Sequence, residues 1–91
     1  MATIKIPTPL RAYTSGQAEI AVEGCNVGAI LESLTGQFPE LRQHLFNDEE
    51  LRNFVNIFIG DEDIRYRDGL ETEVENNDRL RIVPSIAGGI F

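Results

Sequence analysis

The 91-residue sequence has one cysteine, one histidine and no tryptophan. A lone cysteine, Cys25, cannot form a disulfide within the chain, and it cannot supply the four thiolates of a ferredoxin-type iron–sulfur cluster. The sequence also lacks a basic and apolar N-terminal signal, and it lacks any apolar run long enough to span a membrane. These absences exclude a disulfide scaffold and favour a cytoplasmic protein.

Basic residues are scarce, since eight Lys and Arg stand against fifteen Asp and Glu for a net charge of −7. No basic cluster is interleaved with aromatic residues, so the chain is expected to repel nucleic-acid phosphates and anionic membranes. We therefore expect neither nucleic acid nor membrane as a partner, and we favour protein partners with basic docking surfaces. Hydrophobic residues make up 42% of the chain and charged residues 25%, which at this length indicates one small folded domain, monomeric on its own.

Two stretches of alternating polar and apolar residues near the N-terminus predict a β-hairpin. They are residues 3–6 and 19–22, with turn-forming residues at 14–17 between them. Pro7 and Pro9 cannot donate backbone hydrogen bonds, so the stretch that follows the first strand is expected to bulge from the sheet or to lie at its edge.

The next segment predicts the principal helix, with Asn26 as its N-cap. Apolar residues at helical spacing form a single stripe, which consists of Val27, Ile30, Leu31, Leu34 and Phe38. Gly36 is placed to end this helix, and Pro39 to begin a short second one. Residues 47–50 are then expected to form an exposed acidic loop.

The second half of the sequence predicts strands. Residues 55–59 alternate in a way that is typical of a strand inside a sheet. Residues 60–63 turn the chain, and residues 64–66 are expected to extend briefly. A final strand at 79–83 carries apolar residues on one face and arginines on the other, and Pro84 closes it.

The order of hairpin, helix and further strands predicts an α+β fold of the β-grasp type. A right-handed crossover through the helix would make the last strand parallel to the first and bury the helix stripe against a mixed sheet of about four or five strands. Residues 1–84 are expected to form this domain, and residues 85–91 a flexible C-terminal tail that leaves from a central strand.

The tail contains a Gly-Gly pair, Gly88-Gly89, which Ala87 precedes and Ile90-Phe91 follows. Glycine has no Cβ, so its backbone can thread a narrow enzyme channel and bring its carbonyl carbon close to a nucleotide phosphate. Residues 85–89 can extend to about 17 Å, enough to enter the active site of a partner. A free Gly89 carboxylate requires cleavage between Gly89 and Ile90, so we expect a carrier whose reactive end is made by proteolysis.

Several segments resemble those of a known protein family and occur in the same order along the chain. They are Ile6-Pro7-Thr8, Phe54-Val55-Asn56-Ile57, Asp61-Glu62-Asp63-Ile64-Arg65-Tyr66, Gly69-Leu70, residues 78–83 and Pro84-Ser85-Ile86-Ala87-Gly88-Gly89. Together they resemble the ubiquitin-like sulfur carriers of the ThiS/MoaD superfamily, and among these most of all the CysO-type carriers of cysteine biosynthesis. The familiar CysO-type carrier ends at its Gly-Gly. The additional Ile90-Phe91 resembles the extension of carriers that a zinc-dependent JAMM-type peptidase trims.

The resemblance implies a protein co-substrate and not an enzyme, with Gly89 as the site of sulfur attachment. An E1-like adenylyltransferase and sulfurtransferase would adenylate the Gly89 carboxylate with ATP, and sulfur would displace AMP to leave a thiocarboxylate. The thiocarboxylate would attack an aminoacrylate on a pyridoxal-phosphate-dependent cysteine synthase, and after an acyl shift the JAMM-type peptidase would release cysteine. ATP, pyridoxal phosphate and zinc thus belong to the partners, and no cofactor or metal is expected on the carrier.

Two alternatives stay open at this point. In the first, the chain is the small subunit of a molybdopterin synthase, and the same tail inserts into a larger catalytic subunit. In the second, it is a ubiquitin-like protein modifier, and Gly89 ends in an isopeptide bond to a lysine.

The remaining reactive side chains have simpler interpretations. Cys25 is interpreted as a small packing residue and His44 as a surface residue. The acidic residues Asp61, Glu62 and Asp63 are expected to form a solvated turn or a docking contact, because they lack the spacing of a calcium loop. Weak surface ion pairs are expected for the arginines of the C-terminal half, Arg65, Arg67, Arg79 and Arg81.

Overall fold

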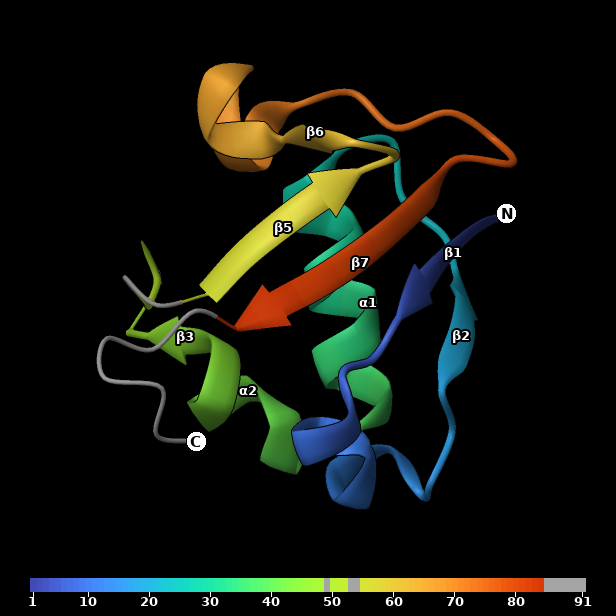
Figure 1. Cartoon of the computed structure of the whole chain (residues 1–91), viewed down its shortest axis with the longest axis vertical. Coiled ribbons are helices and arrows are strands. Elements are labelled where there is room, and N and C mark those ends of the chain that lie inside the picture. Colours follow the sequence, from blue (N-terminus) through green and yellow to red (C-terminus); the bar gives the residue numbers. More distant parts are fainter. Residues whose placement is uncertain (49, 53–54, 85–91) are drawn as a thin grey trace.

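The structure is a computed structural model that describes residues 1–48, 50–52 and 55–84. A five-stranded mixed sheet has the strand order β2-β1-β7-β5-β6, and a small second sheet pairs β3 with β4 (Figure 1). The strands are β1 (Ala2–Lys5), β2 (Glu19–Val22), β3 (Phe46–Asn47), β4 (Glu50–Leu51), β5 (Val55–Ile59), β6 (Glu62–Asp63) and β7 (Arg79–Pro84). The helices are α1 (Val27–Gln37) and α2 (Pro39–Leu45), with the 3₁₀ helices η1 (Thr8–Thr14), η2 (Ile64–Tyr66) and η3 (Gly69–Glu71).

The strand pairing confirms the β-grasp prediction. β1 and β2 form the N-terminal antiparallel hairpin, with Ile4 opposite Ile20. β7 lies parallel to β1 on one side, with Leu80 opposite Ile4, and antiparallel to β5 on the other. The last strand of the domain is therefore central in the sheet, as the crossover through α1 requires.

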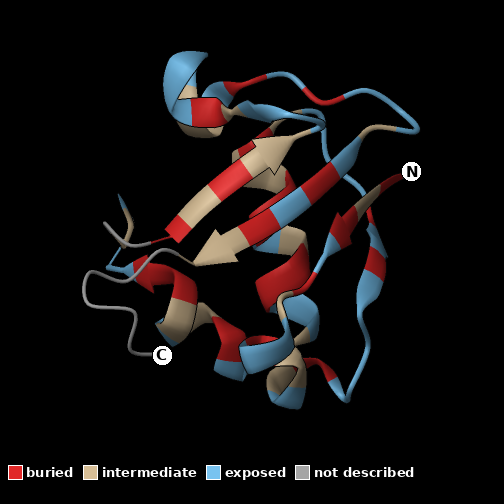
Figure 2. Ribbon diagram, viewed as in Figure 1, coloured by how far each residue is buried: buried red, intermediate tan, exposed pale blue. Residues whose placement is uncertain are grey.

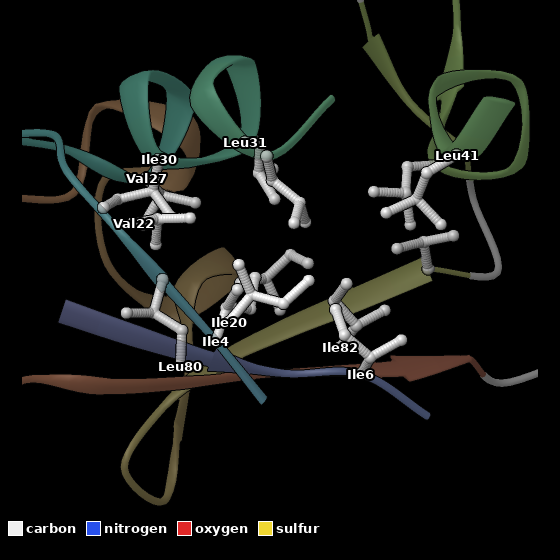
Figure 3. Packing of buried hydrophobic residues seen from close by; sticks show 14 of the residues in the cluster. Ile4, Ile6, Ile20, Val22, Val27, Ile30, Leu31, Leu41, Leu80 and Ile82 are labelled. Atoms are coloured by element: carbon white, nitrogen blue, oxygen red, sulfur yellow. The ribbon is translucent and has the colours of Figure 1, made fainter. Parts of the chain in front are cut away.

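One layer of apolar side chains joins the helices to the sheet. In Figure 3, Ile30 and Leu31 point from α1 towards Ile4 and Leu80 on the strands, and Figure 2 shows the buried and exposed bands that alternate along β7. The largest fully buried side chains are Ile4, Ile6, Ile30, Leu31, Leu34, Leu41, Leu45, Ile57, Ile64, Leu80, Val22 and Val27. Burial of each such Leu or Ile contributes about 1.5 to 3 kcal/mol, so this layer holds the sheet on α1.

The start of α1 confirms the predicted cap. The Oδ1 atom of Asn26 accepts a hydrogen bond from the backbone N–H of Ala29 at 2.8 Å, which satisfies one of the otherwise unpaired donors of the first turn. Just before it, a Cβ on Gly24 would lie 2.8 Å from the backbone nitrogen of Ile30. The chain therefore passes so close to the helix that only glycine fits at this position.

The end of α1 differs from the prediction. Gly36 does not end the helix, because α1 continues through Gln37 and Phe38 is the C-cap. Phe38 donates its backbone N–H to the carbonyl of Leu34 at 3.0 Å, and Pro39 begins α2 directly after it. The break thus comes from the residue before a proline, whose backbone disfavours the helical region.

Replacement of Gly36 by alanine tests this boundary. Gly36 lies inside the helix, and an added Cβ meets no atom within 4 Å. We expect Gly36→Ala to raise the free energy of unfolding by about 0.5 to 1 kcal/mol, since alanine loses less backbone entropy in a helix. Urea denaturation followed by circular dichroism measures the change.

Gly60→Ala is the matched control for this substitution. Gly60 also has open space around it, but its φ of +60° lies in the left-handed region. An L-residue there costs about 1 to 2 kcal/mol, so this variant is expected to lose stability. A comparable loss in Gly36→Ala would mean that the helix ends at Gly36 after all.

Three irregular segments also differ from the predictions. Residues 7–10 neither bulge from the sheet nor lie on its edge, because Pro9 stands in the first turn of the 3₁₀ helix η1, which begins at Thr8 and where a proline is tolerated. Residues 64–66 form η2 instead of an extended segment, since the Asp63 carboxylate accepts from the backbone N–H of Arg65 at 2.9 Å. In the predicted acidic loop after α2, Asn47, Asp48 and Glu50 are exposed as expected, but Asn47 belongs to β3 and Glu50 to β4, and Asp48 has a φ of +62°.

Candidate functional site

The site that the sequence predicts begins where β7 ends. Pro84 is the last described residue, and it lies opposite Val55 in the antiparallel pairing of β5 with β7. The pairing of β7 with β1 ends at Arg81, whereas its pairing with β5 continues to Pro84, so β5 holds the last residues before the tail. The residues predicted to react or to enter a partner, Ala87, Gly88, Gly89 and Ile90, lie outside the described residues.

The neighbouring end of β5 is held by backbone and side-chain hydrogen bonds. The backbone N–H of Val55 donates to the carbonyl of Arg52 at 3.0 Å, and the Val55 carbonyl accepts from Nη2 of Arg65 at 3.0 Å. The Val55 side chain is buried. The exit of the tail is thus supported by a strand that is itself anchored to η2.

A cleft of about 570 Å³ lies between α2 and the β3–β4 hairpin. Figure 1 shows both elements at the end of the sheet where β7 finishes. The guanidinium of Arg42 lies 4.9 Å from the centroid of the Phe46 ring and 3.4 Å from a carboxylate oxygen of Glu32. The cleft is lined by Pro39, Glu40, Arg42, Gln43, Phe46, Asn47, Asp48 and Arg52. The lining combines the apolar Pro39 and Phe46 with polar side chains of both charges, and it contains no nucleophile paired to a base.

Two predictions on single residues are wrong. Cys25 is exposed and does not pack in the core, because it lies in the bend before the Asn26 cap, where the chain has left the sheet. His44 is half-buried and not a surface residue: its ring stacks on Tyr13 with centroids 4.2 Å apart, and its Nε2 atom is buried without a hydrogen-bond partner. The helix α2 turns this face of His44 towards η1, which the sequence spacing alone does not show.

The arginines of the C-terminal half behave differently from one another. Arg67 forms the expected exposed ion pair, with Nε 3.1 Å from a carboxylate oxygen of Glu62. Arg65 donates to a backbone carbonyl, and Arg81 lies with its guanidinium 4.9 Å from the centroid of the Phe58 ring. The prediction of ion pairs is therefore correct for Arg67 and wrong for Arg81, because the antiparallel register places Phe58 directly beside it.

Metal ligands do not gather in the described part of the chain. Within it, no group of three or more His, Cys, Asp and Glu side chains is arranged to hold a metal ion. Of the three acids predicted to form a turn, Asp61 lies in the turn before β6, whereas Glu62 and Asp63 form β6 itself. Glu62 pairs with Arg67, and Asp63 caps η2. The helices of the described residues are also too short or too polar to cross a membrane.

A mixed five-stranded sheet under one main helix, with a central C-terminal strand that leads into a Gly-Gly segment, defines a ubiquitin-like β-grasp protein. The sequence profile of the ThiS family matches residues 4–89, which is nearly the whole chain. The chain belongs to the ThiS family.

Comparison with known proteins gives nearly full-length matches. The chain is 36% identical over 90 residues to the sulfur carrier protein CysO of Mycobacterium tuberculosis, with 96% of this chain and 97% of the relative covered. The structure superimposes with a TM-score of 0.91 on a chain of the Amycolatopsis orientalis BexX/CysO complex, at 36% identity, with 98% and 100% of the two chains covered.

A third match is to the small archaeal modifier protein 1 of Methanosarcina acetivorans, with a TM-score of 0.85, 30% identity, and 97% and 95% of the chains covered. The full-length relatives are thus named as carriers and a modifier, not as enzymes, in agreement with the expectation of a protein co-substrate. The chain is similar to CysO-type sulfur carrier proteins along almost its entire length.

Proposed function

We propose that this protein carries sulfur as a thiocarboxylate on Gly89 and delivers it for cysteine biosynthesis. The observation that carries the proposal is that the full-length similarity to CysO-type carriers coincides with a family match that ends at Gly89. The central position of β7 supports it, because the strand fixes the start of the tail while the body of the domain docks outside the active site of a partner.

The chemistry begins with removal of the residues after Gly89, here Ile90-Phe91. A carboxylate oxygen of Gly89 then attacks the α-phosphorus of ATP on an E1-like activating enzyme, which forms an acyl adenylate and releases pyrophosphate. Hydrosulfide attacks the carbonyl carbon of Gly89 and expels AMP, so the thiocarboxylate keeps one oxygen and gains one sulfur. Adenylation is required because a carboxylate is a poor electrophile, and ATP places the reaction in the cytoplasm.

The finer part of the proposal concerns the acceptor. The thiocarboxylate sulfur attacks an aminoacrylate held by a pyridoxal-phosphate-dependent cysteine synthase, and a shift of the acyl group from sulfur to nitrogen gives a carrier joined to cysteine by an amide. A JAMM-type zinc peptidase hydrolyses this amide and regenerates the Gly89 carboxylate. The carrier supplies no acid, base, metal or cofactor in these steps.

Formation of the cysteine adduct tests this acceptor. Thiocarboxylate carrier that is mixed with the cysteine synthase of the same organism and an activated serine is expected to gain the mass of one aminoacrylate, which makes it one cysteine residue heavier than the carboxylate form. The adduct should resist hydroxylamine, because an amide has replaced the thioester. A carrier that keeps its thiocarboxylate in the presence of active synthase would argue for another acceptor, and a stable complex with a molybdopterin synthase large subunit would identify that pathway.

Similarity to a small archaeal modifier protein favours a second candidate function, attachment of Gly89 to lysines of other proteins. Such conjugates leave a glycine-containing remnant on the modified lysine after protease digestion. Enrichment and mass spectrometry of these remnants from the wild-type strain and from a deletion strain test whether conjugation occurs. Remnants absent from the deletion strain would establish conjugation, and equal remnant levels in both strains would exclude it.

A further inference from the structure

The face of the sheet opposite α1, here called the outer face, carries three basic side chains on two adjacent strands. In the parallel pairing of β1 with β7, Thr3 lies opposite Arg79 and Lys5 lies opposite Arg81. Their sequence neighbours Ile4 and the other core-facing residues are buried, so side-chain alternation turns Lys5, Arg79 and Arg81 to the outside, where all three are exposed. These three residues are called the cationic patch.

The cationic patch borders one shallow cleft of about 270 Å³. The cleft is lined by Thr3, Lys5, Glu19, Gly60, Asp61, Arg79, Leu80 and Arg81. Glu19 lies directly opposite Lys5 in the pairing of β1 with β2, and Asp61 also lines the cleft, but the ion pairs found among the described residues join Arg42 to Glu32 and Arg67 to Glu62. No member of the patch has its charge neutralised by an ion pair within the described part of the chain.

An aromatic ring lies beside the patch. Arg81 stacks on Phe58, with 4.9 Å between its guanidinium carbon and the ring centroid, and the ring is half-buried. Across the sheet, Arg81 on β7 lies between Lys5 on β1 and Phe58 on β5. Phe58 in turn lies opposite Asp63 on β6. Arginine and aromatic side chains are the residue types enriched in protein interfaces.

The patch and the tail belong to the same strand. Pro84 is three positions after Arg81, a distance of about 10 Å along a strand. A partner that holds the tail close to the sheet is therefore within reach of the patch. The rest of this acidic chain, with its net charge of −7, repels an acidic partner, so such a partner approaches favourably only from the side of the patch.

We propose that the cationic patch docks an acidic surface of the enzyme that activates the tail, and so orients the carrier for entry of the Gly-Gly segment. This inference rests on the proposed function. The overall composition favours partners with basic surfaces, whereas the proposed docking face requires a partner with an acidic surface. The difference arises because positive charges are gathered on the strand that leads into the tail.

The test compares two variants with the same change in net charge. Lys5→Gln with Arg79→Gln removes charge from the patch and leaves the Arg81–Phe58 contact intact. Gln17→Glu with Gln37→Glu changes the net charge by the same amount at exposed positions outside the patch. Each is prepared with the chain trimmed after Gly89, which keeps every described residue, and is given to the E1-like activating enzyme of the same organism in an ATP–pyrophosphate exchange assay.

We expect the patch variant to raise the KM for the carrier on the order of tenfold with kcat unchanged, since steering charges act on association. The wild-type KM should rise more steeply with salt concentration than that of the patch variant. The Gln17 and Gln37 control should keep the wild-type KM.

Three results would overturn the proposal. Normal exchange with an unchanged KM in the patch variant would overturn the docking role alone, and absence of exchange with the wild-type chain would overturn the proposed function together with it. Binding of a single-stranded oligonucleotide by the wild type, lost in the patch variant while KM stays constant, would assign the patch to nucleic acid instead.

Discussion

A Gly89→Ala chain trimmed after residue 89 is expected to fold like the wild type and to lose tail activation. The added Cβ stands beside the carbonyl carbon that has to approach the α-phosphate of ATP in a narrow channel, where a side chain clashes. A misplacement of about 1 Å at the reacting atoms costs on the order of a hundredfold in rate, and we expect a loss of at least this size in ATP–pyrophosphate exchange. Thermal unfolding of the same sample verifies the fold.

Gly36→Ala is the control for this experiment, because it makes the same chemical change at an exposed helical site. It should be activated at the wild-type rate. Thiocarboxylate formation at an unreduced rate by the Gly89→Ala chain would refute the assignment of Gly89 as the reactive residue.

Ile57→Ala is expected to lower the free energy of unfolding by about 2 to 5 kcal/mol, a large share of the stability of a small domain. Ile57 is 0% exposed and sits in the middle of β5, opposite Ile82 on β7. Its truncation removes apolar contacts and leaves a cavity between the sheet and the helices. Urea denaturation of the purified variant measures the loss.

Asn56→Ala provides a neighbouring control. Asn56 is half-buried on the opposite side of β5, where it lies across from Val83, and its substitution should change stability by no more than about 0.5 kcal/mol. If Ile57→Ala behaved like this control, β5 would not contribute to the core. Under conditions where the Ile57→Ala chain is folded, its tail should still be activated. The substitution lowers the stability of the core and does not alter the reactive Gly89.

The regular part of the fold can be predicted from the sequence because its signals are local and periodic. The alternation around Ile4 and Ile20 predicts the hairpin, and the stripe that includes Ile30 and Leu34 predicts the buried face of α1. The parallel pairing of the first and last strands was also predicted, from a right-handed crossover through the principal helix, and β1 and β7 are parallel.

The irregular segments could not be predicted because their conformations depend on competing local interactions. Pro9 suits both a sheet edge and a first helical turn, and the structure has the turn, in a 3₁₀ helix that packs against α2 through Tyr13 and His44. Gly36 is compatible with a helix interior as well as with a helix end, and Pro39 decides where α1 stops. The hydrogen bond from the backbone of Arg65 to Asp63 favours a 3₁₀ turn over extension.

The candidate site could also be predicted only in part from the sequence. The Gly-Gly segment and its position after a core strand follow from the sequence, and the reactivity of Gly89 stays a prediction because residues 85–91 lie outside the described residues. The cationic patch was not predicted, because Lys5 and Arg81 stand at opposite ends of the sequence. The alternation of each strand combined with the parallel register of β1 and β7 is the signal that brings them together.

The most direct test of sulfur transport by this protein is the intact mass of the chain purified from its native host during sulfur demand. A species that ends at Gly89 is expected, and part of it should carry the mass increase of one oxygen replaced by sulfur. Treatment with an alkylating reagent should modify the sulfur of this species. Its mass should then rise by the mass of the alkyl group, and the unmodified thiocarboxylate peak should disappear. If the trimmed chain is present only as the carboxylic acid, or the chain is never trimmed at Gly89, the protein does not carry sulfur in the way proposed.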